Sequence, residues 1–266
     1  MSSSSGPKSS DSNLGSTTLT IRGTARFISD IHLSADCPDL ATRFATFLAD
    51  TAASKVTTLF ILGDLFDAWI GDDDLAQPFN AEICSLLRKL SDQGTQIFFI
   101  AGNRDFLMGD RFAQAAGLQR LDEMEKLGAG DTAILIMHGD TLCTDDTDYQ
   151  AFRQQVHAPA WQRDFLARPL TERRAEAAAL RKKSMAATKE KSQNIMDVNT
   201  EAVRQALIAS GCRRLIHGHT HRPGCEHIML VDGVAERWVL SDWDSHRGDA
   251  LEVSTDGSIR RINLAG

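Results

Sequence analysis

Side chains of the types that bind metal ions recur after apolar runs of this chain. Asp30 and His32 are separated by one residue, and in an extended segment such side chains point the same way, so both can reach one ion. His219 and His221 have the same spacing in a late loop. The full set of candidate ligands is Asp30, His32, Asp64, Asn103, His138, His219 and His221. Separate segments thus supply carboxylate, amide and imidazole groups.

The types of candidate ligand indicate which metal ions the site would bind and which reaction those ions would support. Oxygen and imidazole ligands without a thiolate suit Mn²⁺, Fe or Zn²⁺ better than Ca²⁺. The carboxylate of Asp64 can bridge two cations, and a cation pair about 3.5–4 Å apart is a known clamp for displacement at phosphorus. A metal-bridging hydroxide held by Asp64 would then be the nucleophile. Taken alone, Asp64 also fits a turn cap and each His a packing role, so only the combination predicts a two-metal site.

Alternating strands and helices are expected to position these groups. The apolar run 59–62 predicts a buried strand, and Gly63 ends it with a turn that places Asp64 at its carboxyl end. Further patterns predict strands at 25–30, 58–62, 96–101 and 133–137, and helices from 38, at 80–92 and at 109–116. This order predicts βαβ units and a mostly parallel sheet, which binds ligands at the carboxyl ends of its strands.

A helical block interrupts this alternation. Only helical patterns are found from 149 to 210, and short strands resume at 214–216, 237–240, 250–254 and 258–263. We therefore predict one domain over 21–266 with a helical insertion, or lid, at 149–198, after a polar and disordered extension at 1–20. Residues 151–191 carry a net charge of +6, which leaves −13 elsewhere. A solvated surface helix of mixed charge is the alternative interpretation of this block.

Composition argues against several classes of protein. The net charge of −7 argues against a general nucleic-acid binder. Five scattered cysteines fit reduced thiols and argue against a disulfide framework or a Cys-based zinc site. The chain has no apolar run of about 18 residues and no signal-sequence pattern, so any membrane contact is expected to be peripheral.

The order of the ligand segments resembles the calcineurin-like metallophosphoesterase superfamily. The resemblance covers roughly residues 25–255 and includes Asp30-x-His32, Gly63-Asp64, Gly102-Asn103, His138 and Gly218-His219-Thr220-His221. It implies an α/β fold of the αββα sandwich type with a dinuclear site at the strand ends. By this resemblance, one metal is held by Asp30, His32, Asp64 and His221, and the other by Asp64, Asn103, His138 and His219.

Longer runs resemble one family within that superfamily, the UDP-2,3-diacylglucosamine diphosphatases of lipid A biosynthesis. These runs are 63–73, 102–107, 138–146, 195–199 and 217–223. The resemblance implies two Mn²⁺ per chain and hydrolysis of UDP-2,3-diacylglucosamine at the α-phosphorus, which releases UMP and 2,3-diacylglucosamine 1-phosphate (lipid X). It also implies a peripheral protein on the anionic cytoplasmic face of the bacterial inner membrane, with no nucleic-acid partner.

The same resemblance implies a set of substrate contacts. These are Asn103, Arg104, Asp146, Ser184, Thr188, Lys191 and His219. Most of the superfamily has a proton-donating His where this chain has Arg104. Because arginine keeps its proton, Arg104 is expected to clamp a phosphate oxygen instead, and a stable phosphate leaving group tolerates the loss of the acid.

The insertion offers apolar side chains for acyl chains and basic side chains for a diphosphate or an anionic membrane. They are Phe152, Val156, Trp161, Phe165, Leu166 and Leu170, with Arg163, Arg168, Arg173, Arg174, Arg181, Lys182 and Lys183. The block is therefore expected to be both a lid and a membrane-facing surface.

Several residues and functions leave alternatives open. Ser241-Asp242-Trp243-Asp244 is similar to a late Gly-x-Trp-His segment of the family but differs at both ends, and it lies outside the ligand set. His217 is expected to support the site or to pack, and Cys143 to pack. A generic metal-dependent phosphodiesterase or nuclease on the same fold is the nearest alternative function, and a non-catalytic scaffold is a more distant one.

Overall fold

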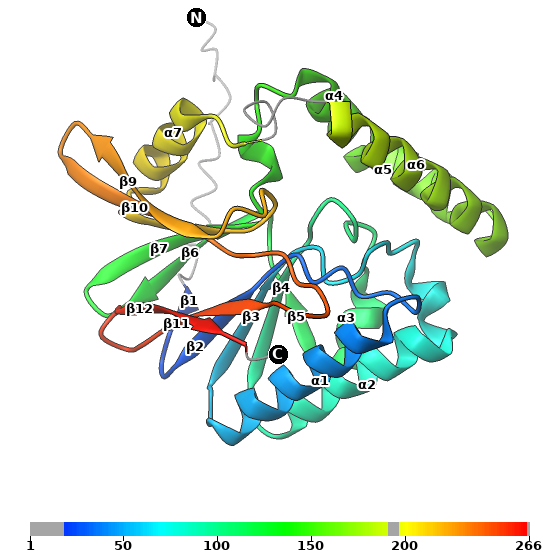
Figure 1. The fold of residues 1–266 in the computed structure, drawn as a ribbon, viewed down its shortest axis with the longest axis horizontal. Helices are drawn as coiled ribbons and strands as arrows, with labels where there is room; N and C mark the ends of the chain where they lie inside the picture. The colour runs from blue at the N-terminus through cyan, green and yellow to red at the C-terminus, as the bar shows by residue number, and fades with distance from the viewer. Residues whose placement is uncertain (1–18, 191–196, 265–266) are drawn as a thin grey trace, which may run out of the picture.

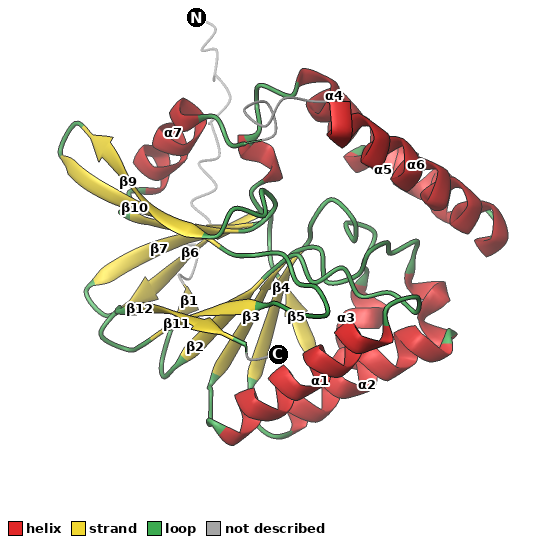
Figure 2. Cartoon of the chain, viewed as in Figure 1, coloured by secondary structure: helices red, strands yellow, loops and turns green. Residues whose placement is uncertain are grey.

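The computed structural model describes residues 19–190 and 197–264 and places two mixed β-sheets face to face (Figures 1 and 2). The first sheet has the strand order β12-β11-β2-β3-β4-β5. Its strands are β2 (Ala25–Ile28), β3 (Thr58–Leu62), β4 (Gln96–Ile100), β5 (Leu118–Arg120), β11 (Asp249–Val253) and β12 (Ile259–Asn263). The strands from β2 to β5 are parallel, whereas β11 and β12 join by antiparallel pairing. The parallel strands therefore end at one edge of the sheet.

The first sheet is buried on both faces, as β3 illustrates. Leu59 and Ile61 belong to the apolar cluster beneath the helices, and Phe60 and Leu62, at the alternate positions, belong to the cluster between the sheets. The helices on the outer face are α1 (Pro38–Ala53), α2 (Pro78–Asp92) and α3 (Asp110–Ala116). A strand that is apolar on both faces gives a continuous apolar run, which is why the sequence predicted it.

The second sheet has the strand order β1-β6-β7-β8-β10-β9. Its strands are β1 (Leu19–Thr20), β6 (Met124–Ala129), β7 (Thr132–Met137), β8 (Arg214–His217), β9 (Gly224–Leu230) and β10 (Gly233–Val239). On its outer face, Val203 and Leu207 of α7 (Thr200–Ser210) cluster with Leu135 and Leu215 of the sheet. The layers are therefore helix, sheet, sheet and helix, which confirms the predicted αββα sandwich.

Part of each sheet differs from the prediction. The sequence patterns predict no strand at β5, which is short, or at β6 and β9, in which polar residues interrupt the apolar run. Leu19 and Thr20 were predicted to belong to the polar extension, but they pair with Leu127 and Gly128 of β6. The rest of that extension, residues 1–18, lies outside the described residues.

Three helices occupy most of the predicted insertion. They are α4 (Thr147–His157), α5 (Pro159–Leu166) and α6 (Leu170–Glu190). In Figure 1 they project from the sheets on the side of the loops that follow the parallel strands. Within 19–190 and 197–264, no helix has both the length and the apolar character needed to span a membrane.

The arginines of α6 dock the insertion onto the core. Arg173 is buried, donates a 2.6 Å hydrogen bond to the carbonyl of Ile70 and forms an ion pair with Asp73. Two further ion pairs join Arg174 to Asp74 and Arg181 to Asp67. These three arginines were predicted to face the substrate or a membrane. The structure corrects this prediction for Arg173, which is buried, whereas Arg174 and Arg181 pair with the acidic segment 67–74 and stay 41% and 43% exposed.

We expect Arg173→Ala to lower the free energy of unfolding by about 2 kcal/mol, because the carbonyl of Ile70 loses a charged donor in a buried position. Arg174→Ala is the matched control, since the Arg174 side chain is 41% exposed and exposed ion pairs contribute at most about 1 kcal/mol. Urea unfolding followed by circular dichroism measures both variants. Equal losses would contradict a special role for Arg173 in docking α6.

Candidate metal centre

Most of the predicted ligands have an unusual backbone conformation. Among the described non-glycine residues, φ is positive at Asp30 (54°), His32 (56°), Lys55 (52°), Asp64 (54°), His219 (66°) and His221 (56°). The left-handed region costs a non-glycine residue about 1–3 kcal/mol, and such residues gather at functional sites. All of them except Lys55 belong to the candidate ligand set. The chain therefore bends sharply where it presents these side chains.

Two glycines permit the close approach of the loops after β3 and β4. Gly63 has a φ of +88°, and a Cβ atom there would lie 2.6 Å from the Cα of Gly102. A Cβ atom on Gly102 would lie 2.2 Å from Oδ1 of Asp64. The pairs Gly63-Asp64 and Gly102-Asn103 thus combine a ligand with the small residue that lets the facing loop come close.

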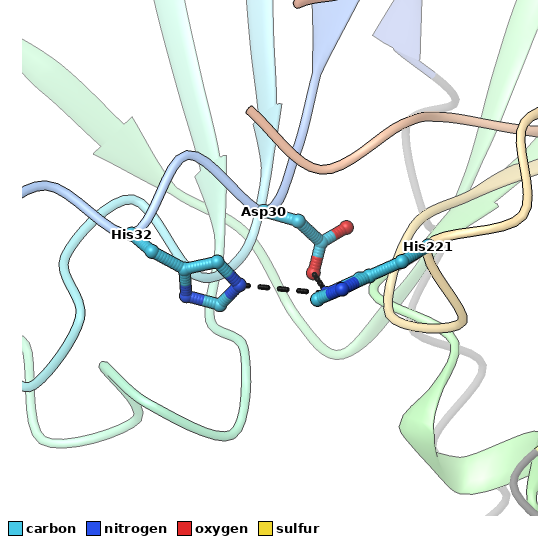
Figure 3. Close-up of side chains that lie close together, drawn as sticks. All are labelled: Asp30, His32 and His221. Atoms are coloured by element: carbon cyan, nitrogen blue, oxygen red, sulfur yellow. Dashed lines mark hydrogen bonds and ion pairs between the residues drawn. The ribbon is translucent and has the colours of Figure 1, made fainter. Parts of the chain in front are cut away.

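Asp30, His32 and His221 form the first group of ligands (Figure 3). Nε2 of His221 lies 3.4 Å from Oδ1 of Asp30 and 3.4 Å from Nε2 of His32. Asp30 is fully buried, and its Oδ1 has no hydrogen-bond partner in the part of the chain that the structure describes. A buried carboxylate oxygen without a donor is costly unless a cation meets it. The group therefore fits a bound metal ion.

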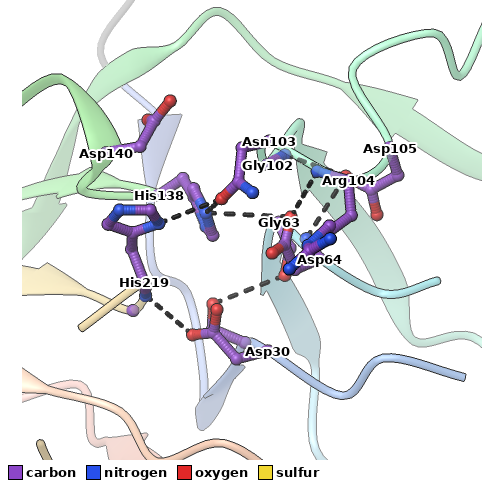
Figure 4. A network of polar contacts seen from close by, with 12 residues as sticks. Asp30, Gly63, Asp64, Gly102, Asn103, Arg104, Asp105, His138, Asp140 and His219 are labelled. Atoms are coloured by element: carbon purple, nitrogen blue, oxygen red, sulfur yellow. Dashed lines mark hydrogen bonds and ion pairs between the residues drawn. The ribbon is translucent and has the colours of Figure 1, made fainter. Parts of the chain in front are cut away.

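Asn103, His138 and His219 form the second group (Figure 4). Oδ1 of Asn103 lies 3.0 Å from Nε2 of His138 and 3.0 Å from Nδ1 of His219. Asp64 lies between the two groups, with Oδ1 3.8 Å from Nε2 of His138 and Oδ2 3.9 Å from Nδ1 of His32. All seven predicted ligands are thus brought together, with Asp64 where a bridging carboxylate belongs.

His138 shows how the protein prepares an imidazole for metal binding. Its Nδ1 lies 2.8 Å from the carbonyl oxygen of Leu62, which can only accept a hydrogen bond. Nδ1 therefore carries a proton, and Nε2 is the nitrogen that faces the site and can bind an ion. Such contacts fix the tautomer and the ring orientation of metal ligands.

The electrostatics of the site favour bound cations. Burial raises the pKa of Asp64 to about 7, opposed by His138 and reinforced by two neighbouring carboxylates. Burial lowers the pKa of His138, but the charges of Asp64 and Asp30 outweigh this effect and raise it to about 9. Burial also lowers the pKa of His32 to about 3 and that of His219 to about 4. His32 and His219 are therefore neutral, which is the form of imidazole that binds metal, whereas His138 must release a proton when an ion binds.

Asp105 holds the two loops that carry Asp64 and Asn103. This fully buried carboxylate accepts hydrogen bonds from the backbone N–H groups of Gly102 (2.9 Å), Leu65 (2.7 Å) and Asp64 (3.2 Å). The sequence analysis included Asp105 in a family run but gave it no role. In the sequence, the position of Asp105 two residues after the candidate ligand Asn103 is the only feature that indicates this role.

Asp140 joins the site to the insertion. Its Oδ2 accepts hydrogen bonds from the Tyr149 hydroxyl (2.9 Å) and from Nε of Arg153 (2.6 Å), both on α4. Asp140 lies two residues after His138 and is buried. The root of the insertion is therefore attached to the strand end that carries a ligand, which sequence reasoning did not predict.

The predicted substrate contacts are only partly described. Arg104 donates its backbone N–H to Oδ1 of Asp64 (2.8 Å), and its buried Nε has no hydrogen-bond partner among the described residues. Asp146 caps α4 through the backbone N–H of Tyr149 (3.1 Å). Ser184 and Thr188 lie on α6 where side chains are not described, and Lys191 lies outside the described residues.

The two residues given supporting roles are buried. His217 lies beside the ligand loop, with Nδ1 2.8 Å from the carbonyl oxygen of Gly218. Cys143 belongs to the apolar cluster beneath α7. Burial raises the pKa of the Cys143 thiol to about 12, so it stays protonated and packs rather than reacts.

Comparison with known proteins identifies relatives along most of the chain. The profile of the calcineurin-like phosphoesterase family matches residues 25–223. A UDP-2,3-diacylglucosamine hydrolase of Serratia proteamaculans is 47% identical over 230 residues, which cover 86% of this chain and 95% of that protein. A UDP-2,3-diacylglucosamine hydrolase of Aromatoleum aromaticum is 46% identical over 235 residues, covering 88% and 94%. A solved structure of a dimetal phosphatase from Danio rerio is 12% identical, with a TM-score of 0.49, and covers 91% of this chain and 98% of that one.

Proposed function

Because the chain belongs to the calcineurin-like phosphoesterase family and is a metal-dependent hydrolase, we propose that it hydrolyses UDP-2,3-diacylglucosamine at the α-phosphorus with two Mn²⁺, giving UMP and 2,3-diacylglucosamine 1-phosphate. The convergence of six ligand side chains around Asp64 carries the metal-dependent chemistry. The relatives that match most of this chain are named UDP-2,3-diacylglucosamine hydrolases, which supports the substrate. This reaction would place the protein in lipid A biosynthesis.

The ligand side chains would hold the cation pair and orient the diphosphate. Asp30, His32 and His221 would hold one ion, and Asn103, His138 and His219 the other, with Asp64 shared. When bound, such a pair activates water at neutral pH and neutralises charge on phosphate oxygens. Mixed oxygen and imidazole ligands suit Mn²⁺.

Arg104 would bind the phosphate oxygens. The backbone N–H of Arg104 donates a hydrogen bond to Asp64, so the Arg104 side chain extends from a backbone position next to the metal centre. Its Nε has no hydrogen-bond partner among the described residues. A guanidinium offers paired donors to a phosphate and stabilises the charge that grows on it during attack. It supplies no proton, and the leaving phosphate monoester needs none.

Incubation of the purified protein with Mn²⁺ and UDP-2,3-diacylglucosamine tests the proposal. We expect release of UMP and 2,3-diacylglucosamine 1-phosphate, and ¹⁸O-labelled water should deliver its oxygen to UMP. Bis-p-nitrophenyl phosphate and single-stranded DNA are run in parallel. Faster cleavage of either would favour a generic phosphodiesterase or nuclease, and no turnover of any of the substrates would favour a scaffold.

We further propose that the insertion contacts the anionic cytoplasmic face of the bacterial inner membrane. Phe152 on α4 and Leu166 on α5 are each 40% exposed. Arg163, three residues before Leu166 on α5, is 74% exposed and forms an exposed ion pair with Asp164. Partly exposed apolar groups beside cations are typical of peripheral binding.

We expect the double change Phe152→Ser and Leu166→Ser to weaken partitioning to vesicles that contain phosphatidylglycerol by about tenfold, because two apolar side chains leave the interface. Val231→Ser is the matched control, since Val231 is fully exposed in the turn between β9 and β10. Sedimentation with vesicles measures binding. Equal partitioning of the double variant and the parent chain would contradict the proposed membrane face.

A further inference from the structure

The loop between β10 and β11 is attached to the metal centre through its backbone. Ser241 donates from its backbone N–H (3.0 Å) and its hydroxyl (2.8 Å) to Oδ1 of Asp249. Trp243 donates its backbone N–H to the carbonyl oxygen of Asp30 (3.0 Å). The Trp243 ring is buried against Phe47, with ring centroids 5.4 Å apart. The residue between these two anchors, Asp242, is therefore held in place.

The carboxylate of Asp242 lies beside the ligand His221. Oδ2 of Asp242 is 3.7 Å from Nδ1 of His221. Oδ1 accepts a hydrogen bond from Arg247 (2.5 Å), whose Nε lies 3.2 Å from Oδ2 of Asp244. Asp244 also accepts the backbone N–H groups of His246 (2.7 Å) and Arg247 (2.8 Å). One oxygen of Asp242 is thus fixed by its own loop, and the other is left for His221.

The two nitrogens of His221 face different partners. Nε2 lies 3.4 Å from Oδ1 of Asp30 and 3.4 Å from Nε2 of His32, so it is the nitrogen directed at the ion. Nδ1 faces Asp242 on the opposite side of the ring. His138 has the same orientation with a closer partner, since its Nδ1 lies 2.8 Å from the carbonyl oxygen of Leu62 and its Nε2 faces the site.

We infer that Asp242 is a positioning residue for the metal centre, and that Arg247 in turn positions Asp242. The negative charge of the carboxylate, 3.7 Å from Nδ1 of His221, favours the tautomer with the proton on Nδ1, so Nε2 keeps its lone pair for an ion and becomes a better ligand. The sequence resemblance assigns nothing to this position. The inference rests on the dinuclear centre of the proposed function but not on the identity of its substrate.

Metal binding to chelator-treated protein tests this role without substrate. Electron paramagnetic resonance of free Mn²⁺ gives the affinities, and Co²⁺ absorption, which reports imidazole coordination, is measured in parallel. We expect Asp242→Asn to lower the affinity for one of the two ions by about tenfold and to leave the affinity for the other unchanged. Changes of about 10- to 100-fold are typical when a partner of a metal ligand is removed. Arg247→Ala should lower the same affinity by a smaller factor, because the carboxylate of Asp242 is still present but no longer accepts a hydrogen bond from Arg247. Asp256→Asn is the control, since Asp256 is exposed in the turn between β11 and β12.

Thermal unfolding separates positioning from a general loss of structure. The metal-free Asp242→Asn variant should unfold at the temperature of the metal-free parent, but added Mn²⁺ should stabilise it less. Unchanged affinities for Mn²⁺ and Co²⁺ in this variant would overturn the inference, as would equal weakening of both ions with a lowered metal-free unfolding temperature. If the parent and the variant differ as expected but neither releases UMP, the proposed substrate fails and the role of Asp242 stands.

Discussion

Asp64→Ala is expected to lower kcat/KM by at least about a thousandfold, which corresponds to about 4 kcal/mol of transition-state stabilisation. Asp64 lies between both groups, with its oxygens 3.8 Å from Nε2 of His138 and 3.9 Å from Nδ1 of His32. Alanine removes both carboxylate oxygens, so in the proposed bridging role both ions would lose a ligand at once. UMP release at saturating Mn²⁺ measures the loss.

The metal-free Asp64→Asn variant distinguishes a lost ligand from a damaged fold. Burial raises the pKa of Asp64 to about 7, above its ordinary value, so its ionised form destabilises the metal-free fold as the pH rises towards 8. A neutral Asn removes that penalty, and the metal-free variant should be at least as stable as the parent at pH 8. Asp92→Asn, an exposed change on α2, is the control. If the Mn²⁺-dependent kcat/KM of Asp64→Ala stays within about tenfold of that of the parent protein, the bridging role of Asp64 is refuted.

Arg104→Ala is expected to lower kcat/KM by about a hundred- to a thousandfold, the usual cost of removing one group that stabilises developing charge. The loss should appear mainly in kcat. Metal affinity should stay unchanged, because the contact of Arg104 with Asp64 is made by its backbone N–H at 2.8 Å, which alanine keeps. Steady-state kinetics and Mn²⁺ titration measure the two quantities.

Arg104→Lys provides the matched comparison for this site. Lysine keeps the positive charge but lacks the paired donors of a guanidinium, so it should restore only part of the activity. Full activity of the lysine variant would show that charge alone is needed. A pH-rate profile that loses an acidic group in Arg104→Ala would contradict the view that Arg104 donates no proton.

The sequence alone determined which side chains form the centre and which strands carry them. The strands β3 and β4 are apolar on both faces over 59–62 and 97–100, so they appear as continuous apolar runs, and the turns after them carry ligands. Gly63 and Gly102 also mark these turns in the sequence, because only glycine allows the loops after β3 and β4 to approach each other so closely. These features depend on local chain geometry, which a linear pattern records.

Only the tertiary structure decided how the charges are paired. Arg173 and Asp73 are separated by 100 positions, and no periodicity relates them, so the basic insertion suggested a ligand surface where the fold made a docking contact. The same holds for Asp105 beside Asp64, and for Asp242 beside His221. An ionic or hydrogen-bonded contact between distant segments depends on which loops the folded core brings together. That choice is made by packing in three dimensions, and it leaves no signal along the chain.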